Sequence, residues 1–144
     1  MATVKTFLKK THQEVVVKIA GGGGTNTTIT LAELIAAGQE LDPDALNQEV
    51  SILAAQWTGA ADGVATISRN STTIMTLQST PAGIITLDDG TFVPDNINAT
   101  SDIVVTTEGT AVEVWLRLRK VSGYRTLVEP EQFGHYDDPT VAGA

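Results

Sequence analysis

Val112-Glu113-Val114-Trp115-Leu116-Arg117-Leu118 is the stretch that decides the fold, because apolar and polar side chains alternate along it without a break. One face of this stretch carries Val112, Val114, Leu116 and Leu118, and the other carries Glu113, Trp115 and Arg117, with Arg119 continuing the second row. A period of two is typical of a β-strand with one buried face. Trp115 is a large aromatic residue in the charged row, which indicates that something covers that face.

Further strands are predicted on both sides of this one. They are bounded by turn residues such as Asn70-Ser71 and recur roughly every 8–12 residues. The predicted strands cover 13–19, 27–31, 50–57, 64–69, 73–77, 84–87, 91–93 and 103–107. The strand at 27–31 should close a hairpin with the strand before it. Helical propensity is confined to Ala32–Ala37, which Gly38 ends, and to a single turn from Asp42 to Leu46.

The pattern predicts an all-β fold: a single antiparallel β-sandwich, of which a jelly roll is one form, with at most one short helical segment and extended termini. We assign residues 1–12 to an N-terminal arm, 13–126 to the β-sandwich domain and 127–144 to an extended C-terminal tail. The first segment is basic and the last is acidic, so the two ends could pair between neighbouring subunits. Solvated termini are the alternative.

Composition narrows the classes of function. A chain of 144 residues fits one domain. Cysteine is absent, which excludes disulfides, thiolate metal sites and cysteine nucleophiles. The net charge of −8 argues against binding to nucleic acid, which depends on Lys and Arg neutralising phosphates. No apolar run approaches the roughly 20 residues of a membrane helix, so we expect no membrane partner.

Residues with catalytic or metal-binding chemistry do not form a recognisable site. His12 and His135 lie at opposite ends of the chain without a nucleophile motif, and surface positions are the simpler interpretation. An ion could bind the acidic group Asp88, Asp89, Asp95 and Asp102, but its spacing is not that of an EF-hand. Turn formation explains these residues better. We therefore predict no catalytic residue, no cofactor and no metal.

Several segments together resemble small virion structural proteins of tailed bacteriophages, notably those of cyanophages and related marine phages. The resemblance covers roughly residues 15–124. It is carried by Trp57-Thr-Gly59, Ile67-Ser-Arg-Asn70, Ile74 to Leu77, Asp89-Gly90, Asn96, Asn98 to Thr106 and Leu116 to Tyr124.

The resemblance implies a β-sandwich protein without catalytic activity that binds a phage particle. The expected role is a capsid decoration (cement) protein on the outer surface of the virion, made in the host cytoplasm. The alternatives are a neck, tail or fibre component, or a carbohydrate- or receptor-binding module. The expected partners are the major capsid protein or other virion proteins and further copies of this chain, as a dimer or trimer.

The interface hypothesis names a small set of residues. Trp115, Arg117 and Arg119 form its centre, because they share one face of the strand that opens this section. The charged and aromatic residues of the two ends complete it, namely Lys9, Lys10, Phe133 and Tyr136. The alternative is that the chain's own tail covers the Trp115 face.

Overall fold

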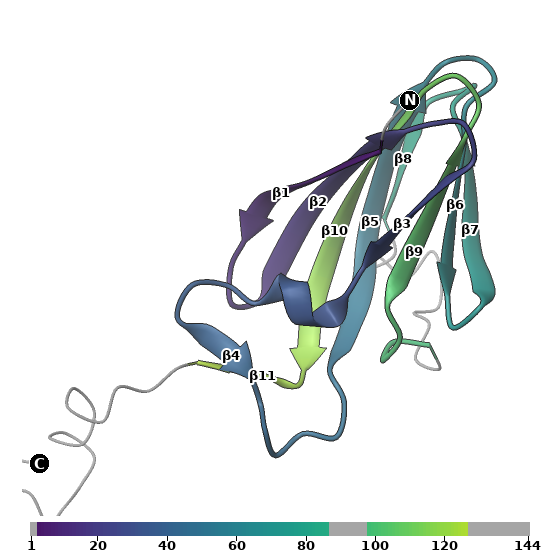
Figure 1. Ribbon diagram of the computed structural model, residues 1–144. Coiled ribbons are helices and arrows are strands. Elements are labelled where there is room, and N and C mark those ends of the chain that lie inside the picture. The colour runs from purple at the N-terminus through teal and green to yellow at the C-terminus, as the bar shows by residue number, and fades with distance from the viewer. Residues whose placement is uncertain (1–2, 87–97, 127–144) are drawn as a thin grey trace, which may run out of the picture.

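The fold is known from a computed structural model that describes residues 3–86 and 98–126. Almost every element is a strand (Figure 1). The elements are β1 (Val4–Lys10), β2 (Glu14–Gly21), β3 (Thr25–Ile29), η1 (Leu31–Leu34), β4 (Gln39–Leu41), β5 (Glu49–Gly59), β6 (Val64–Arg69), β7 (Thr72–Gln78), β8 (Gly83–Thr86), β9 (Ile103–Glu108), β10 (Val112–Ser122) and β11 (Tyr124–Thr126).

The strand pairing makes this sandwich a jelly roll. Four antiparallel pairs are nested within one another: β2 with β10, β3 with β9, β5 with β8 and β6 with β7. These pairs, together with β1, form a five-stranded sheet in the order β1-β2-β10-β5-β8 and a four-stranded sheet in the order β3-β9-β6-β7. Two sheets of this kind are the mark of jelly-roll domains. The predicted antiparallel β-sandwich is confirmed.

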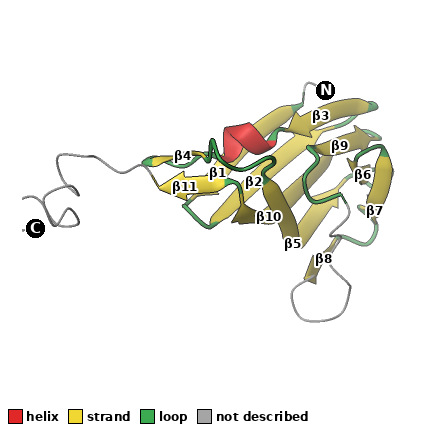
Figure 2. Cartoon of the chain, turned by 90° about the horizontal axis from the view of Figure 1, so that it is seen from below, coloured by secondary structure: helices red, strands yellow, loops and turns green. Residues whose placement is uncertain are grey.

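The two sheets pack face to face (Figure 2). Aliphatic side chains form the core between them. The apolar row of the opening stretch lies in this core, where Val114, Leu116 and Leu118 have no exposed surface. Rows from both sheets face them, since alternate residues of each strand point inward. The core also includes Val15, Val17, Ile19, Ile29, Leu34, Val50, Ala65, Ile67, Ile103 and Val105.

The first residues of the chain differ from the predicted arm. Residues 4–10 form β1, which pairs with β2 along the edge of the five-stranded sheet. A bulge between Phe7 and Lys9 shifts the register, and Phe7 packs against the core. β1 covers an edge that β2 would otherwise expose. The sequence did not indicate this role, because apolar and polar residues do not alternate regularly over residues 4–10.

The prediction that the strands at 13–19 and 27–31 form a hairpin is wrong. β3 pairs with β9 in the other sheet, so the glycine-rich segment carries the chain from one sheet to the other. Gly23 and Gly24 take positive φ angles there, and their amides donate to the carbonyls of Gly109 and Thr107. Positive φ angles are open to glycine at little cost, which explains why glycines fill this crossing.

The helical segment is shorter than predicted, and a small sheet follows it. η1 is one turn of 3₁₀-helix that buries Leu31 and Leu34, and the chain becomes extended at Ile35. The second predicted helical turn, at Asp42, is a non-helical turn closed by a bond from the Ala45 amide to the Asp42 carbonyl. β4 and β11 pair with each other at the end of the sandwich where η1 lies (Figure 1).

Candidate interaction face

The outer face of the five-stranded sheet carries the polar row of the opening stretch. Trp115 stands opposite Lys18 of β2 on one side and Gln56 of β5 on the other. Side chains of directly opposed residues lie on the same face of a sheet. Lys18, Gln56 and Trp115 therefore belong to one surface, which we call the outer face.

Trp115 is half-buried on the outer face and is covered in part by neighbours on its own sheet. The Lys18 ammonium lies 5.4 Å from the centroid of the Trp115 ring, within the range of a cation–π contact. The same ammonium approaches Glu113 at 3.7 Å. Lys18 therefore holds the indole against the sheet and leaves less of the ring free for stacking a ligand.

A three-residue ion cluster follows along the same face. Glu14 accepts a hydrogen bond from the Arg117 guanidinium at 2.6 Å and one from Lys9 Nζ at 3.2 Å. The bond from Arg117, followed by that from Lys9, holds the pKa of Glu14 below its usual value. The cluster links side chains of the three neighbouring strands β1, β2 and β10.

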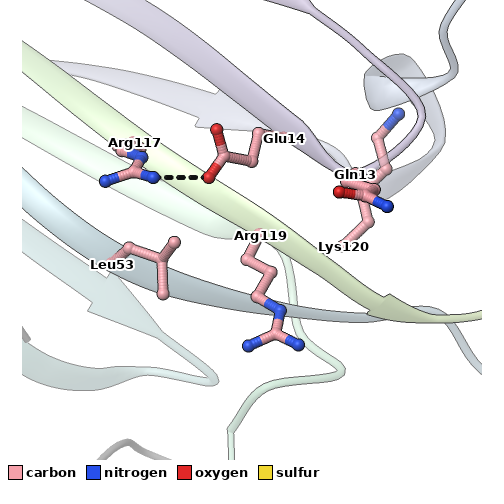
Figure 3. A pocket seen from close by; sticks show the side chains of 6 residues that line it. All are labelled: Gln13, Glu14, Leu53, Arg117, Arg119 and Lys120. Atoms are coloured by element: carbon pink, nitrogen blue, oxygen red, sulfur yellow. Dashed lines mark hydrogen bonds and ion pairs between the residues drawn. The ribbon is translucent and has the colours of Figure 1, made fainter. Parts of the chain in front are cut away.

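A depression of about 490 Å³ opens beside this cluster (Figure 3). Its lining is mostly polar and comes from Gln13, Glu14, Leu53, Arg117, Arg119 and Lys120. Arg119 is exposed and has no hydrogen-bond or ion-pair partner within residues 3–86 and 98–126. Its guanidinium can therefore bind a carboxylate or another planar anion, the groups that Arg recognises best.

Lys120 reaches to the other side of the sheet at this end of β10. Its ammonium donates to the Thr11 carbonyl at 2.9 Å and to Gln39 Oε1 at 2.5 Å. It also lies 5.2 Å from the centroid of the Tyr124 ring. Burial, followed by the charge of Lys10, lowers the pKa of Lys120 to about 8. This lysine ties the β1–β2 turn to β4.

The structure brings part of the predicted interface set together. Trp115, Arg117 and Arg119 lie on the outer face, and Lys9 joins them through Glu14. Lys10 does not, because its partner Val15 points into the core and its ammonium lies over the Phe7 ring at 4.4 Å. The bulge in β1 separates the two neighbouring lysines. Phe133 and Tyr136 lie outside the described residues.

Sequence reasoning missed Gln13, Leu53, Glu14 and Lys18 as members of this site. Glu14 and Lys18 occupy the polar row of their own strand, which is a usable signal. Their neighbours across the sheet, however, are about 100 positions away in the chain: Arg119 opposes Glu14, and Trp115 opposes Lys18. No local pattern specifies such a pairing.

The other candidate residues have structural contacts. Asp102 accepts a hydrogen bond from the Leu31 amide at 3.1 Å, while Asp88, Asp89 and Asp95 lie outside the described residues. His12 uses one ring nitrogen toward the Ala37 carbonyl and the other toward the Thr126 hydroxyl. Within the described ranges no three His, Asp or Glu side chains are grouped to hold a metal ion. Among those same residues no helix has the length and apolar character to cross a membrane.

Comparison with known proteins gives one weak likeness of shape. Neither a family model nor a curated protein matches the sequence. Among solved structures, the chain is similar to an uncharacterized conserved protein with a double-stranded beta-helix domain from Klebsiella pneumoniae. The two share 10% identity at a TM-score of 0.36, over 88% of this chain and 85% of the other.

Proposed function

We propose that the protein is a non-enzymatic structural component of a tailed-phage virion, acting as a decoration protein that binds the outside of the capsid. The resemblance of residues 15–124 to small phage virion proteins motivates the role. The outer face supports it, since it presents Trp115 and Arg117 together. Trp and Arg are enriched among the residues that contribute most to protein–protein binding.

The outer face is the observation that carries the proposal. Its two edges expose apolar side chains, with Val4 on β1 at 56% and Ile84 on β8 at 67%. Between these edges lie Trp115 and the Lys9–Glu14–Arg117 cluster. Aromatic residues and Arg are enriched at protein–protein interfaces, so Trp115 and Arg117 in the middle of this face favour a site that a partner covers.

A decoration protein can stabilise a capsid by binding alone, without catalysing a reaction. A partner that binds only the assembled state stabilises that state by mass action. A decoration protein that bridges capsid subunits therefore raises the free energy needed to break the shell. A cluster of aliphatic side chains packs between the two sheets, so the proposal places binding on the outer face.

Copy number on purified particles tests the proposed location. Quantitative mass spectrometry of phage particles that contain this protein should find it in amounts comparable with the major capsid protein. A dozen or fewer copies per particle would contradict the decoration role and favour a neck, tail or fibre position.

Variants of the outer face test the surface itself. Trp115→Ser and Arg117→Glu should each weaken binding to heads that lack the protein, measured by co-sedimentation. Thr76→Lys is the matched control, since Thr76 is exposed on β7 of the other sheet. Equal binding by all three variants would rule out the outer face. Specific binding to a glycan array would favour a carbohydrate-binding module instead.

A further inference from the structure

The depression on the outer face contains a positively charged guanidinium, that of Arg119, without an ion-pair partner among the described residues. Arg117 is paired with Glu14, whereas Arg119, two residues further along β10, has no partner within residues 3–86 and 98–126. Gln13 adds an amide and Leu53 an apolar wall to the same depression. A guanidinium presents a planar fork of donors that matches a carboxylate. The depression is therefore suited to an acidic side chain.

The chain itself contains an acidic segment without compensating bases. Residues 127–144 include Glu129, Glu131, Asp137 and Asp138 and no lysine or arginine. All nine Lys and Arg residues of the protein precede this segment. The charge of the segment is thus complementary to that of Arg119.

The segment begins close to the depression. Thr126, the last residue of β11, has its hydroxyl 3.3 Å from Nδ1 of His12. His12 is next in sequence to Gln13, which lines the depression. Three extended residues span about 10 Å, so Glu129 is within reach of this rim, and Glu131 can reach further.

We propose that the acidic segment 127–144 binds the depression of its own chain, with Glu129 or Glu131 on the Arg119 guanidinium. A tether this short gives the carboxylates an effective concentration of about millimolar or more, so a weak ion pair is enough for occupancy. Phe133 and Tyr136 would then join Trp115 on the outer face. The inference does not depend on the proposed virion function.

The test uses the full chain and two reciprocal NMR measurements. In Glu129→Gln/Glu131→Gln, the Arg119 Nε–Hε resonance should shift. In Arg119→Gln, the amides of residues 129–136 should shift. Both changes should also appear in the unmodified chain at ~0.5 M NaCl, where the Debye length falls to a few ångströms. Lys18→Gln is the matched control, because Lys18 lies on the outer face but not in the depression, and it should leave these tail amides unchanged.

A charge exchange completes the test. Arg119→Glu should displace the segment, and adding Glu129→Lys and Glu131→Lys should restore the tail amides to shifted positions that are again sensitive to salt. An Arg119 resonance that is identical with and without the two glutamates would overturn the proposal. Shifts that fade on about tenfold dilution would also overturn it, because they would assign the contact to a second copy of the chain.

Discussion

Arg69 shows how much a single buried residue can organise in this fold. Its side chain is 2% exposed, and its guanidinium donates to the carbonyls of Val50, Ala99 and Ser101. The alternation in β6 places Arg69 on the inward row with Ala65 and Ile67. The sequence pattern therefore predicts that the Arg69 side chain points inward. It does not predict that this side chain binds the irregular segment at Ala99 and Ser101.

Replacing this arginine should be costly. Arg69→Met removes the guanidinium donor from three carbonyls, of which that of Ala99 keeps its bond from the Val50 amide, and we expect the free energy of unfolding to fall by about 3–5 kcal/mol. Urea denaturation measures the change. Arg119→Met, at an exposed position on β10, should change it by less than about 1 kcal/mol. Similar values for the two variants would contradict the role given to Arg69.

Lys120 should make stability depend on pH in the alkaline range. Its pKa is about 8 in the folded protein and 10.5 without burial, so between these values the unfolded chain binds more protons. Stability should therefore rise with pH from about 8 toward 10, and this rise should be absent in Lys120→Met. Urea unfolding across this range measures it; a parallel slope in both proteins would contradict the assignment.

Above pH 10 the free energy of unfolding should begin to fall with rising pH. Burial, followed by the charge of Asp102, raises the pKa of Tyr124 above its usual value of 10.0. The unfolded chain then loses the phenolic proton first, and stability should fall as pH rises further. Tyr124→Phe should lose this fall, although it also loses the bond to the Leu31 carbonyl.

At the scale of elements, the β6–β7 hairpin is set by its two turn residues. Asn70 and Ser71 have φ angles of 50° and 59°, the left-handed conformation of a type I′ turn. Asn is common there and Ser is not, whereas Gly is preferred at the second position. Ser71→Gly should raise the free energy of unfolding by about 0.5–1 kcal/mol, measured in urea. Ser71→Val should lower it, and the opposite order would refute this turn geometry.

β1 protects the edge of an apolar strand. Without it, the backbone groups of β2 and the side chains of Val15, Val16 and Val17 would lie at an open sheet edge, which favours aggregation. Deleting residues 1–10 should lower the melting temperature and produce light scattering on storage. Leu8→Ser, at the exposed bulge, is the control and should change neither. A soluble, fully stable deletion variant would show that residues 1–10 are an arm after all.

At the scale of the whole molecule, nested pairing should produce a gradient of local stability. β2, β10, β5, β9 and β6 have neighbours on both sides, while β1, β3, β7, β8 and the β4–β11 pair lie at edges. Amides of Val114 and Leu116 should exchange with solvent most slowly, and those of β4 and β11 fastest among the strands. Hydrogen-exchange NMR measures this order, and equal protection of β11 and β10 would contradict it.

The sequence by itself determined the strands of the four nested pairs, their inward rows and the tight turn at Asn70, because these depend on residues close together in the chain. It did not indicate β1, β4 or β11. The helix prediction was too long, since Leu31 and Leu34 need only one turn to reach the core. Only the tertiary structure decided that β2 pairs with β10 and β3 with β9. It alone also placed Glu14 beside Arg117 and Arg119 next to an open depression. Pairing across about 100 residues is selected by the packing of both sheets at once, so no local pattern records it.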